Sequence, residues 1–298
     1  MRNHEGLTEE AFLKTYDVSQ FERPSVTVDM LIFSVVNEEE KNYRKLPEKA
    51  LKILLVKRGQ HPFLGQWGLP GGFVGIKESL DEAALKKLKS ETNVNDVYLE
   101  QLYTWGGVER DPRTRVISTS YLSLVDSSTL NVQAGDDASD AKWFSVNDEV
   151  LEEKITKTDK GQIFERIVEL NFINGDELLR TTLKITTEVK GRISKFCRTL
   201  VHNDGIAFDH AAIIHYGLER LRNKIEYTDI AFNLMPELFT LTELQQVYEI
   251  ILSKELLKAN FRRKIADLVI ETNEIKRDAG HRPSKLFRYN PQWHKERY

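Results

Sequence analysis

Cysteine is almost absent from this chain, since Cys197 is the only one. A single thiol excludes an intramolecular disulfide, and it also excludes a thiolate cluster for zinc or an iron–sulfur group. We therefore expect Cys197 to have a structural role.

Long apolar runs are missing as well. No run approaches the roughly 20 residues that a membrane-spanning helix requires, and residues 1–10 lack the basic and apolar regions of a signal peptide. We expect a cytoplasmic protein with no membrane partner. Internal repeats and low-complexity tracts are also absent, so a repeat architecture is not expected.

The chain is long enough for two domains, because 298 residues exceed one ordinary core. Its hydrophobic content of 40% and charged content of 30% are typical of folded globular proteins. The net charge of -3 is unevenly divided, since residues 239–298 hold 12 Lys and Arg against 8 Asp and Glu. The C-terminal end is basic, although charge alone leaves an ordinary solvated surface equally open.

The N-terminal part is expected to mix helix and strand, in a domain of residues 25–155 that follows an N-terminal segment of residues 1–24. Apolar β-rich runs at 26–36 and 51–56 predict a hairpin with a long exposed loop. A loop rich in Gly and Pro then leads to a helix, whose apolar face is expected to hold Leu80, Ala83, Ala84, Leu85 and Leu88. Further strands are predicted at 97–105, 116–125 and 141–146, with turns at 111–112 and 135–137.

A connecting segment, residues 156–208, is expected to be structured. Residues 161–170 look like a helix, and residues 179–189 alternate in a manner that suits one strand. The chain between the two domains is therefore not a floppy linker.

The C-terminal domain is expected at residues 209–298. Asp209 is placed to cap an amphipathic helix by accepting amide hydrogen bonds, and shorter helices are predicted at 229–234, after Thr240 and within 258–270. Thr240 and Glu243 form a T-x-x-E capping box, which satisfies exposed amides at both positions. Two extended arms around a turn at Gly280 close the chain.

The loop of residues 66–74, with the letters QWGLPGGFV, resembles the loop of the Nudix hydrolases. Gly72 and Glu78, with five residues between them, match the opening of the signature G-x5-E-x7-R-E-U-x-E-E-x-G-U, in which U is aliphatic. The resemblance implies a loop that positions a diphosphate and a helix that presents glutamates to Mg2+, which neutralises charge and activates water. The alternative is an ordinary Gly-rich connection, which the length of the phrase disfavours.

Beyond Glu78 the sequence departs from that signature. Lys86 stands at the Arg position, and Lys87 and Ser90 stand where the family has metal-binding glutamates, so that only Glu91 of that set remains. An ammonium at a cation site adds repulsion to the lost ligand, and one carboxylate does not readily offset the cost of dehydrating Mg2+. We expect a hydrolytically silent domain without catalytic residues, metal site or cofactor, with weak Mg2+ binding left open.

Two other phrases are similar to segments of the ADP-ribose-type Nudix proteins. They are RDPR at 110–113 and GDDA at 135–138, the second followed by Lys142, Trp143 and Phe144. This similarity implies a pocket for a nucleoside diphosphate sugar or a relative of it. Arg110 and Arg113 either contact phosphate or pair with Asp111 as exposed loop charges, and both readings stay open. Trp143 and Phe144 are expected in the core.

The C-terminal part resembles the winged-helix half of the Nudix-related transcriptional regulators, the NrtR family. The resemblance is carried by FDHA at 208–211 with Ile213 and Ile214, LERLR at 218–222, FTLTELQ at 239–245 and NFRRK at 260–264, and by GHRPS at 280–284, where His281 is inserted in the G-R-P segment of the wing. The two halves occur in the order of that family. The expected fold class is therefore α+β, with a Nudix α/β/α sandwich, an all-helical linker region and a winged helix-turn-helix domain.

This resemblance assigns an effector pocket to the first domain. The residues expected to bind the effector are Arg58, Trp67, Pro70, Gly71, Gly72, Phe73, Glu78, Glu91, Arg110 and Arg113. The effector is expected to be an ADP-ribose-like nucleotide or a pentose such as arabinose. The loss of the metal ligands makes a neutral sugar more plausible than it is in an intact Nudix site.

The basic end suits a recognition helix, which keeps an apolar face on its domain and turns cations and amides toward a DNA groove. Arg262 and Arg263 are expected to share one broad face, whereas Lys264 lies farther round, toward phosphate. The residues expected to bind DNA are Lys258, Asn260, Arg262, Arg263, Lys264, Lys276, Arg277, Arg282 and Lys285. A narrow basic loop at Gly280 suits a minor groove. His210 is expected to pack between the domains, since no partner ligands lie at metal spacing.

The function expected is a ligand-responsive DNA-binding regulator that acts as a homodimer on a palindromic operator. Ligand binding would favour one dimer geometry and so change the spacing of the two recognition helices. The alternative is a Nudix hydrolase of ADP-ribose or a related nucleoside diphosphate sugar, which must explain Lys87 and Ser90. A metabolite-binding scaffold without DNA contact is a third possibility.

Overall fold

The computed structural model describes residues 4, 6–38, 47–93, 97–127, 138–159, 161–276 and 283–294. Its strands in the main sheet are β1 Ser25–Asn37, β2 Lys49–Arg58, β3 Trp67–Gly68, β4 Gly71–Phe73, β5 Tyr98–Trp105, β6 Val116–Leu124, β7 Ala138–Thr158, β8 Gly161–Asn174, β9 Glu177–Lys190 and β10 Ile193–Asn203. The helices are α1 Glu9–Thr15, α2 Leu80–Thr92, α3 His210–Ile225, α4 Leu241–Leu252 and α5 Lys258–Ile265, with short 3-10 turns η1 Val18–Gln20, η3 Ile230–Leu234, η4 Ala266–Leu268 and η5 Pro291–His294. A separate hairpin consists of β11 Val269–Lys276 and β12 Ser284–Tyr289.

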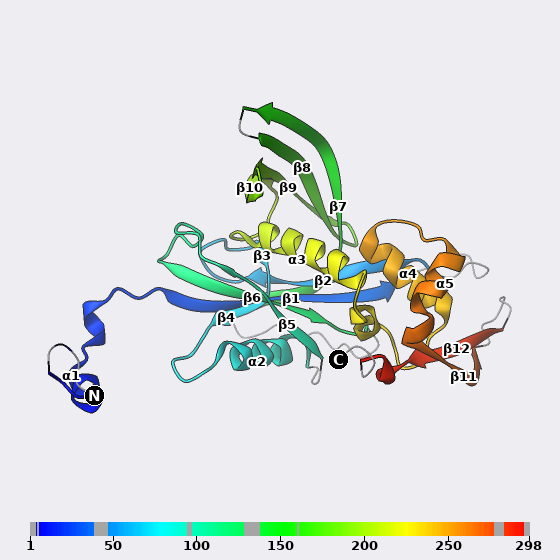
Figure 1. Cartoon of the computed structure of the whole chain (residues 1–298), viewed down its shortest axis with the longest axis horizontal. Coiled ribbons are helices and arrows are strands. Elements are labelled where there is room, and N and C mark those ends of the chain that lie inside the picture. Colours follow the sequence, from blue (N-terminus) through cyan, green and yellow to red (C-terminus); the bar gives the residue numbers. More distant parts are fainter. Residues whose placement is uncertain are drawn as a thin grey trace.

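The main sheet runs in the order β10-β9-β8-β7-β2-β1-β6-β5, with β3 on β2 and β4 on β1. Strand β1 pairs in parallel with β6 and antiparallel with β2, as the predicted hairpin of residues 26–36 and 51–56 requires. Helix α2 covers one face of the sheet and α3 covers the other (Figure 1). The loop between β1 and β2 and the turn at 135–137 lie largely outside the described residues.

The sandwich follows from the alternation of β1, in which successive side chains point to opposite faces. Val28, Met30 and Ile32 form one buried cluster with the apolar side of α2. The intervening Leu31 and Phe33 join a second cluster with α3 and the C-terminal helices. The expected α/β/α sandwich is confirmed, and its second helical layer is α3, which comes from the segment assigned to the C-terminal domain.

Helix α2 begins where the sequence predicts a helix after the Gly-rich loop. Ser79 and Glu82 form a reciprocal capping box at its start. Asn93 ends it at φ 55°, a left-handed conformation that Asn tolerates, at the position where the Nudix signature has Gly. Leu85 was expected on the apolar face, but it is 50% exposed, because α2 buries only Ala83, Ala84 and Leu88 of the expected set.

The connecting segment corrects the sequence-based prediction, because the expected all-helical linker region is built from strands. Residues 161–170, predicted as a helix, lie in β8, and the strand predicted at 179–189 is β9. Ile163, Ile167 and Leu170 have helix-like spacing, but Val168, Leu170 and Phe172 alternate and are the residues that are buried. The expected boundary at 155 falls inside β7, and the division into domains stays a prediction.

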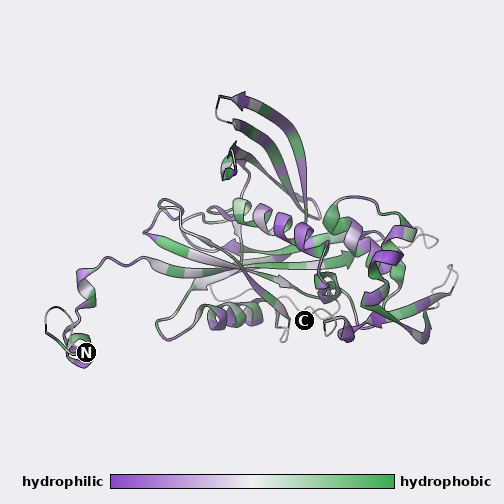
Figure 2. Ribbon diagram, viewed as in Figure 1, coloured by the Kyte–Doolittle hydropathy of each residue, from purple (hydrophilic) through white to green (hydrophobic). Residues whose placement is uncertain are grey.

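These strands form an antiparallel meander that rises above the body of the molecule (Figure 1). Apolar and polar bands alternate along its strands (Figure 2), and several apolar side chains, among them Ile155, Ile193 and Phe196, are exposed. Cys197 lies on β10 and is a free, exposed cysteine, so the expected structural role of its thiol is not supported by burial.

The C-terminal helices and hairpin have the arrangement expected of a winged helix. Thr240 and Glu243 form the predicted capping box at the start of α4. The helix predicted at 229–234 is the 3-10 turn η3, and that predicted within 258–270 ends at Ile265 before η4. Phe239 exchanges two backbone hydrogen bonds with Phe287, so that it pairs with the outer side of β12.

Among the helices that the structure describes, none has the length and apolar character needed to span a membrane.

Candidate functional site

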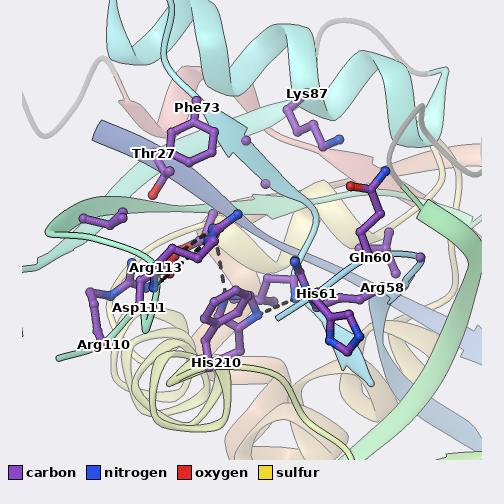
Figure 3. Close-up of a pocket in the computed structure, with 18 of the residues that line it drawn as sticks. Thr27, Arg58, Gln60, His61, Phe73, Lys87, Arg110, Asp111, Arg113 and His210 are labelled. Atoms are coloured by element: carbon purple, nitrogen blue, oxygen red, sulfur yellow. Dashed lines mark hydrogen bonds and ion pairs between the residues drawn. The ribbon is translucent and has the colours of Figure 1, made fainter. Parts of the chain in front are cut away.

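A cavity of about 230 Å³ opens beside β4, between α2 and the start of α3 (Figure 3). Its lining is strongly basic, because five cationic side chains face two carboxylates. The cations are Lys57, Arg58, Lys87, Arg110 and Arg113, and the carboxylates are those of Asp29 and Asp111. Such a lining attracts an anion more than a neutral molecule.

Two glycines of the loop bring backbone to the wall of the cavity. Gly71 pairs with Asp29 across β4 and β1, and a Cβ there would stand 2.6 Å from Asp29 Oδ1 and 2.6 Å from the carbonyl oxygen of Val28. Only glycine fits at this position. A Cβ at Gly72 would meet nothing within 4 Å, so this residue faces open space. Both glycines line the cavity, as expected.

Asp29 joins several elements beneath the cavity. Ser118 Oγ of β6 donates a hydrogen bond of 2.5 Å to Asp29 Oδ2, and Arg110 Nη2 lies 3.4 Å from the same oxygen. His210 Nε2 lies 3.7 Å from Asp29 Oδ1. The side chain of Asp29 is only 9% exposed, so these groups replace water as the partners of its charge. Sequence reasoning missed Asp29, which sits within an apolar run of β1.

Arg110 is buried and tied to the start of α3. Its Nε and Nη2 donate hydrogen bonds of 3.0 and 2.7 Å to the two carboxylate oxygens of Asp209. Burial alone would lower the pKa of Arg110, but the hydrogen bonds and charge of Asp209 outweigh burial and raise it. Asp209 is the N-cap residue of α3, yet its side chain makes no capping hydrogen bond, which corrects the expected role.

Arg113 pairs with Asp111, which is one of the two roles that the sequence left open, and its contact with a phosphate stays a prediction. Its Nε and Nη2 donate hydrogen bonds of 3.0 and 2.7 Å to Asp111, which hold the pKa of that carboxyl below its usual value. The guanidinium also lies 5.6 Å from the ring centre of Phe73 and 5.8 Å from that of Phe208, at the cavity. Arg113 therefore pairs with Asp111 and lines the cavity at once.

Phe208 and His210 enter the cavity from the segment before α3 and at its first residue. Arg58 lies 4.8 Å over the ring of Phe208, whose φ of 54° is unusual for an aromatic residue. The Leu69 amide donates a hydrogen bond of 2.9 Å to His210 Nδ1, and burial lowers the pKa of this histidine, so it is neutral. The predicted packing of His210 between the two parts of the chain agrees with this contact. In the sequence, Phe208 belongs to the FDHA segment that resembles the winged-helix half, so it was not predicted to line the cavity.

Trp67 and Pro70 were expected at the cavity, but they do not line it. Trp67 is 2% exposed, packs edge-on against Phe144 at 4.8 Å, and donates a hydrogen bond of 2.7 Å from Nε1 to Glu177 Oε1. Its indole is therefore a core group that fastens β3 to the meander. The carbonyl oxygen of Pro70 accepts a hydrogen bond of 2.7 Å from the Met30 amide. Phe144 lies in the core, as predicted.

The carboxylates that remain from the Nudix signature are held by lysines. Glu78 Oε1 pairs with Lys86 Nζ at 2.8 Å, and Glu91 Oε1 pairs with Lys87 Nζ at 2.8 Å. Neither glutamate lines the cavity, whereas Lys87 does. Within the described ranges, no three His, Cys, Asp or Glu residues gather as metal ligands would. The residues present do not fit the divalent cation that the Nudix fold implies.

The basic residues of the C-terminal part fall into two groups. Helix α5 buries Phe261 and Ile265 and exposes the candidates Lys258, Asn260, Arg262 and Arg263. Others are tied to carboxylates: Lys264 pairs with Glu226 at 2.8 Å, Lys276 with Glu243 at 2.8 Å, and Lys285 with Glu271. Arg277, Gly280 and Arg282, the expected wing, lie outside the described residues. The broad face expected for Arg262 and Arg263 is thus solvent-exposed, and Lys264 is directed elsewhere.

The far end of α3 is joined to the winged helix by Arg222. Its Nη1 donates a hydrogen bond of 2.7 Å to Asp148 of β7, and its Nε donates one of 2.9 Å to the carbonyl oxygen of Ile251. A cation beside the last carbonyls of α4 is favourable, because the C-terminal end of a helix is electronegative. Helix α3 therefore contacts the cavity at its first residue and α4 near its last.

Known proteins share both halves of this arrangement. The sequence matches the family model of the NUDIX domain over residues 28–166 and that of the NrtR DNA-binding winged helix domain over residues 231–289. The "ADPR responsive transcriptional repressor NtrR" of Acinetobacter baylyi is 31% identical over 285 residues, which cover 95% of this chain and 88% of that protein. The chain thus combines a Nudix domain with a DNA-binding winged helix domain. It belongs to the NrtR family of Nudix-related transcriptional regulators, as the resemblance indicated.

Solved structures agree with this assignment. The NrtR of Shewanella oneidensis, in a crystal structure with a 27mer DNA, is 30% identical with a TM-score of 0.59, over 90% of this chain and 94% of that one. A MutT/nudix family protein from Enterococcus faecalis is 26% identical with a TM-score of 0.65, over 95% and 94%. An ADP-ribose pyrophosphatase of Methanocaldococcus jannaschii is 41% identical over 100 residues, which are 34% of this chain and 58% of that protein.

Proposed function

We propose that this protein is a transcriptional repressor that binds operator DNA through its winged helix and responds to a nucleoside diphosphate, such as ADP-ribose, in the cavity beside α2. The Nudix domain acts as a sensor and has no hydrolytic role. The observation that carries the proposal is the contact of the basic cavity with α3 through Arg110 and Asp209, since α3 also contacts the winged helix. The relative named as ADPR responsive supports the choice of ligand.

The chemistry of the cavity favours an anionic nucleotide over the pentose that the sequence left open. Five cations and two carboxylates leave an excess of positive charge, which a diphosphate would neutralise through charge-assisted hydrogen bonds. The rings of Phe73 and Phe208 offer apolar surface for a base or a ribose. A neutral sugar would leave the guanidinium groups of Arg58 and Arg113 without an anion from the ligand.

The buried pair of Arg110 and Asp209 gives the ligand a means to act on α3. A phosphate oxygen that reaches Arg110 competes with Asp209 for the same guanidinium, and the start of α3 then loses its ion pair with Arg110. Arg222 carries a shift of α3 to the end of α4, which supports the recognition helix α5. Such coupling requires that the ligand bind the two positions of α3 with different affinity.

A homodimer on a palindromic operator fits the same scheme, because two winged helices read two half-sites. The exposed apolar side chains of the meander, such as Ile155, Ile193 and Phe196, offer surface for a second copy. A shift of α3 in both copies would alter the spacing of the two α5 helices. Analytical ultracentrifugation tests the dimer directly, and a monomer at DNA-binding concentrations would contradict it.

The proposal is tested by gel-shift with DNA from the region upstream of the gene for this protein, with and without ADP-ribose. Wild-type protein is expected to bind selectively and to release DNA when ADP-ribose is added. Asp209→Asn weakens the pair with Arg110 already in the absence of ligand, so the variant should still bind ADP-ribose, bind DNA more weakly than wild type and respond less to ADP-ribose. Asp176→Asn, in an exposed turn between β8 and β9, is the matched control and should behave as wild type. Absence of selective DNA binding by wild type would refute the proposal.

A hydrolase is the second candidate, because an ADP-ribose pyrophosphatase is 41% identical over 100 residues of this chain. The ion pairs of Glu78 with Lys86 and of Glu91 with Lys87 argue against this function, because they occupy the carboxylates that would bind the metal ion. Phosphate release from ADP-ribose with Mg2+, measured through a coupled phosphatase, separates the two functions. Ordinary enzymatic turnover would reverse the assignment, whereas ligand binding without turnover would support the sensor.

A further inference from the structure

We propose that the ammonium of Lys87 takes the place of the divalent cation of a Nudix site, so that the diphosphate of the effector is bound without metal. This inference rests on the proposed function and deepens it, because it assigns a role in ligand recognition to a residue that stands where a metal ligand is lost. The inference is supported by the position of Lys87 at the cavity, by its ion pair with the buried Glu91 and by the cations on the opposite side of the cavity.

Lys87 lies on the wall of the cavity. It projects from α2, and Arg110, Arg113 and His210 lie across the cavity from it (Figure 3). Its side chain is 23% exposed, so the ammonium is partly withdrawn from water and still accessible to a ligand. A ligand in the cavity therefore has cations on both sides, as a diphosphate between a metal ion and arginines would have.

Glu91 holds the ammonium in this position. The carboxylate of Glu91 is fully buried, and its ion pair with Lys87 Nζ, at 2.8 Å, is the contact that balances its charge. No hydrogen bond from the described residues reaches either oxygen of Glu91. A buried carboxylate without a counter-charge is strongly unfavourable, so Lys87 stays beside Glu91 whether or not ligand is present.

The pair thus repeats what a metal does in such a site. A divalent cation in such a site would supply positive charge that offsets the charge of a carboxylate and of a phosphate. The Lys87 ammonium has three N–H donors, and besides its ion pair with Glu91 it can donate to a phosphate oxygen. Because Glu91 keeps the ammonium in place, little side-chain entropy is lost when ligand binds. Metal is then unnecessary for binding, and a lysine does not activate water for hydrolysis.

The test is isothermal titration of the full-length protein with ADP-ribose and, separately, with inorganic pyrophosphate, each in EDTA and in Mg2+. Wild type is expected to bind equally well in both conditions. Lys87→Met should lose at least tenfold in affinity for both probes, and Lys87→Arg should keep most of it. Lys89→Met, on an exposed position of the same helix, is the matched control and should leave the affinity unchanged.

Lys87→Glu restores the residue type of the Nudix signature. Its affinity should fall in EDTA and recover at least in part when Mg2+ is added, a dependence that wild type lacks. If Lys87→Met fails to fold, because it leaves Glu91 buried without a partner, the double variant Lys87→Met/Glu91→Gln removes both charges and replaces it. Thermal unfolding without ligand identifies which variants are folded.

The results separate this inference from the proposed function. If ADP-ribose does not bind but pyrophosphate binds in a manner that depends on Lys87, the effector assignment fails and the role of Lys87 stands. If wild-type binding requires Mg2+, or if the folded Lys87 variants bind like wild type, the role of Lys87 is overturned while the effector assignment stands. Failure of wild type to bind either probe overturns both.

Discussion

Substitution of Gly217 by alanine tests how closely α3 packs on the sheet. Gly217 lies in α3 and is buried against β1, where a Cβ would stand 2.3 Å from Leu31 Cδ2. Carbon atoms in good contact are about 3.5–4.0 Å apart, so an added methyl group requires a displacement of more than about 1 Å. Leu31 is fully buried, which leaves its side chain little room to turn away.

Two opposing effects decide the sign of the change in stability. In an unconstrained helix, alanine is favoured over glycine by about 1 kcal/mol. Overpacking of a core costs about 1–3 kcal/mol, and the short contact with Leu31 places Gly217 at the upper end of that range. Gly217→Ala is therefore expected to lower the free energy of unfolding by about 1–2 kcal/mol. The corresponding fall in Tm is about 2–8 °C.

Thermal unfolding in a double-mutant cycle separates the two effects. In a Leu31→Ala background the clash is absent and a cavity is present, so Gly217→Ala should now raise Tm, by about 2–4 °C. The sign of the effect thus reverses between the two backgrounds. Asn223→Ala, on the exposed side of the same helix, is the control for helix propensity and should be neutral or mildly stabilising. Stabilisation by Gly217→Ala in the wild-type background would refute the close packing.

Three further predictions concern pH, the core tryptophan and the recognition helix. Burial lowers the pKa of His215 to about 4, while the pKa of an unfolded histidine is near 6.5. The free energy of unfolding should therefore be unaffected by this group above about pH 6.5 and fall by about 3 kcal/mol as the pH drops to 4. Urea unfolding of His215→Gln should show a shallower fall with pH than wild type, and equal pH profiles would contradict the prediction. Trp67→Phe removes the hydrogen bond to Glu177 and part of the core packing, so the free energy of unfolding should fall by about 1–3 kcal/mol and Tm should fall with it. The affinity for ADP-ribose, measured by titration, should not change. A tenfold loss of affinity at unchanged Tm would place the indole at the ligand. The double variant Arg262→Ala/Arg263→Ala should bind operator DNA at least tenfold more weakly in a gel-shift and bind ADP-ribose like wild type. Unchanged DNA affinity would instead favour a metabolite-binding scaffold that does not contact DNA.

Local signals in the sequence predicted local structure well. The capping box of Thr240 and Glu243 marks the start of α4, because both of its hydrogen bonds form within one turn. The Gly-rich loop before α2 was recognisable because Gly71 is required by a close approach to Asp29. Where the pattern was ambiguous, as in residues 161–170, helix-like spacing of apolar residues concealed a strand that pairs with its neighbours β7 and β9 in an antiparallel meander.

The candidate site was predicted only in part, because its charges are assembled over long distances in sequence. The Arg110–Asp209 pair spans 99 residues, and nothing near either residue indicates the other. Phe208 and His210 stand in a phrase that resembled the DNA-binding half, yet they complete a cavity in the other half. Trp67 was included for its place beside the loop, although its ring points into the core, since neighbours in a strand face opposite sides.

From the sequence, Lys87 was interpreted only as the loss of a metal ligand. At a position that should hold a metal ligand, a lysine indicates decay, and repulsion between its ammonium and Mg2+ supports that interpretation. The structure adds the buried Glu91, whose charge an empty site would leave without a partner. Glu91 therefore requires a counter-charge, which Lys87 supplies. On the function proposed above, Lys87 would bind the diphosphate without a metal ion, and an ammonium group supplies no activated water for hydrolysis.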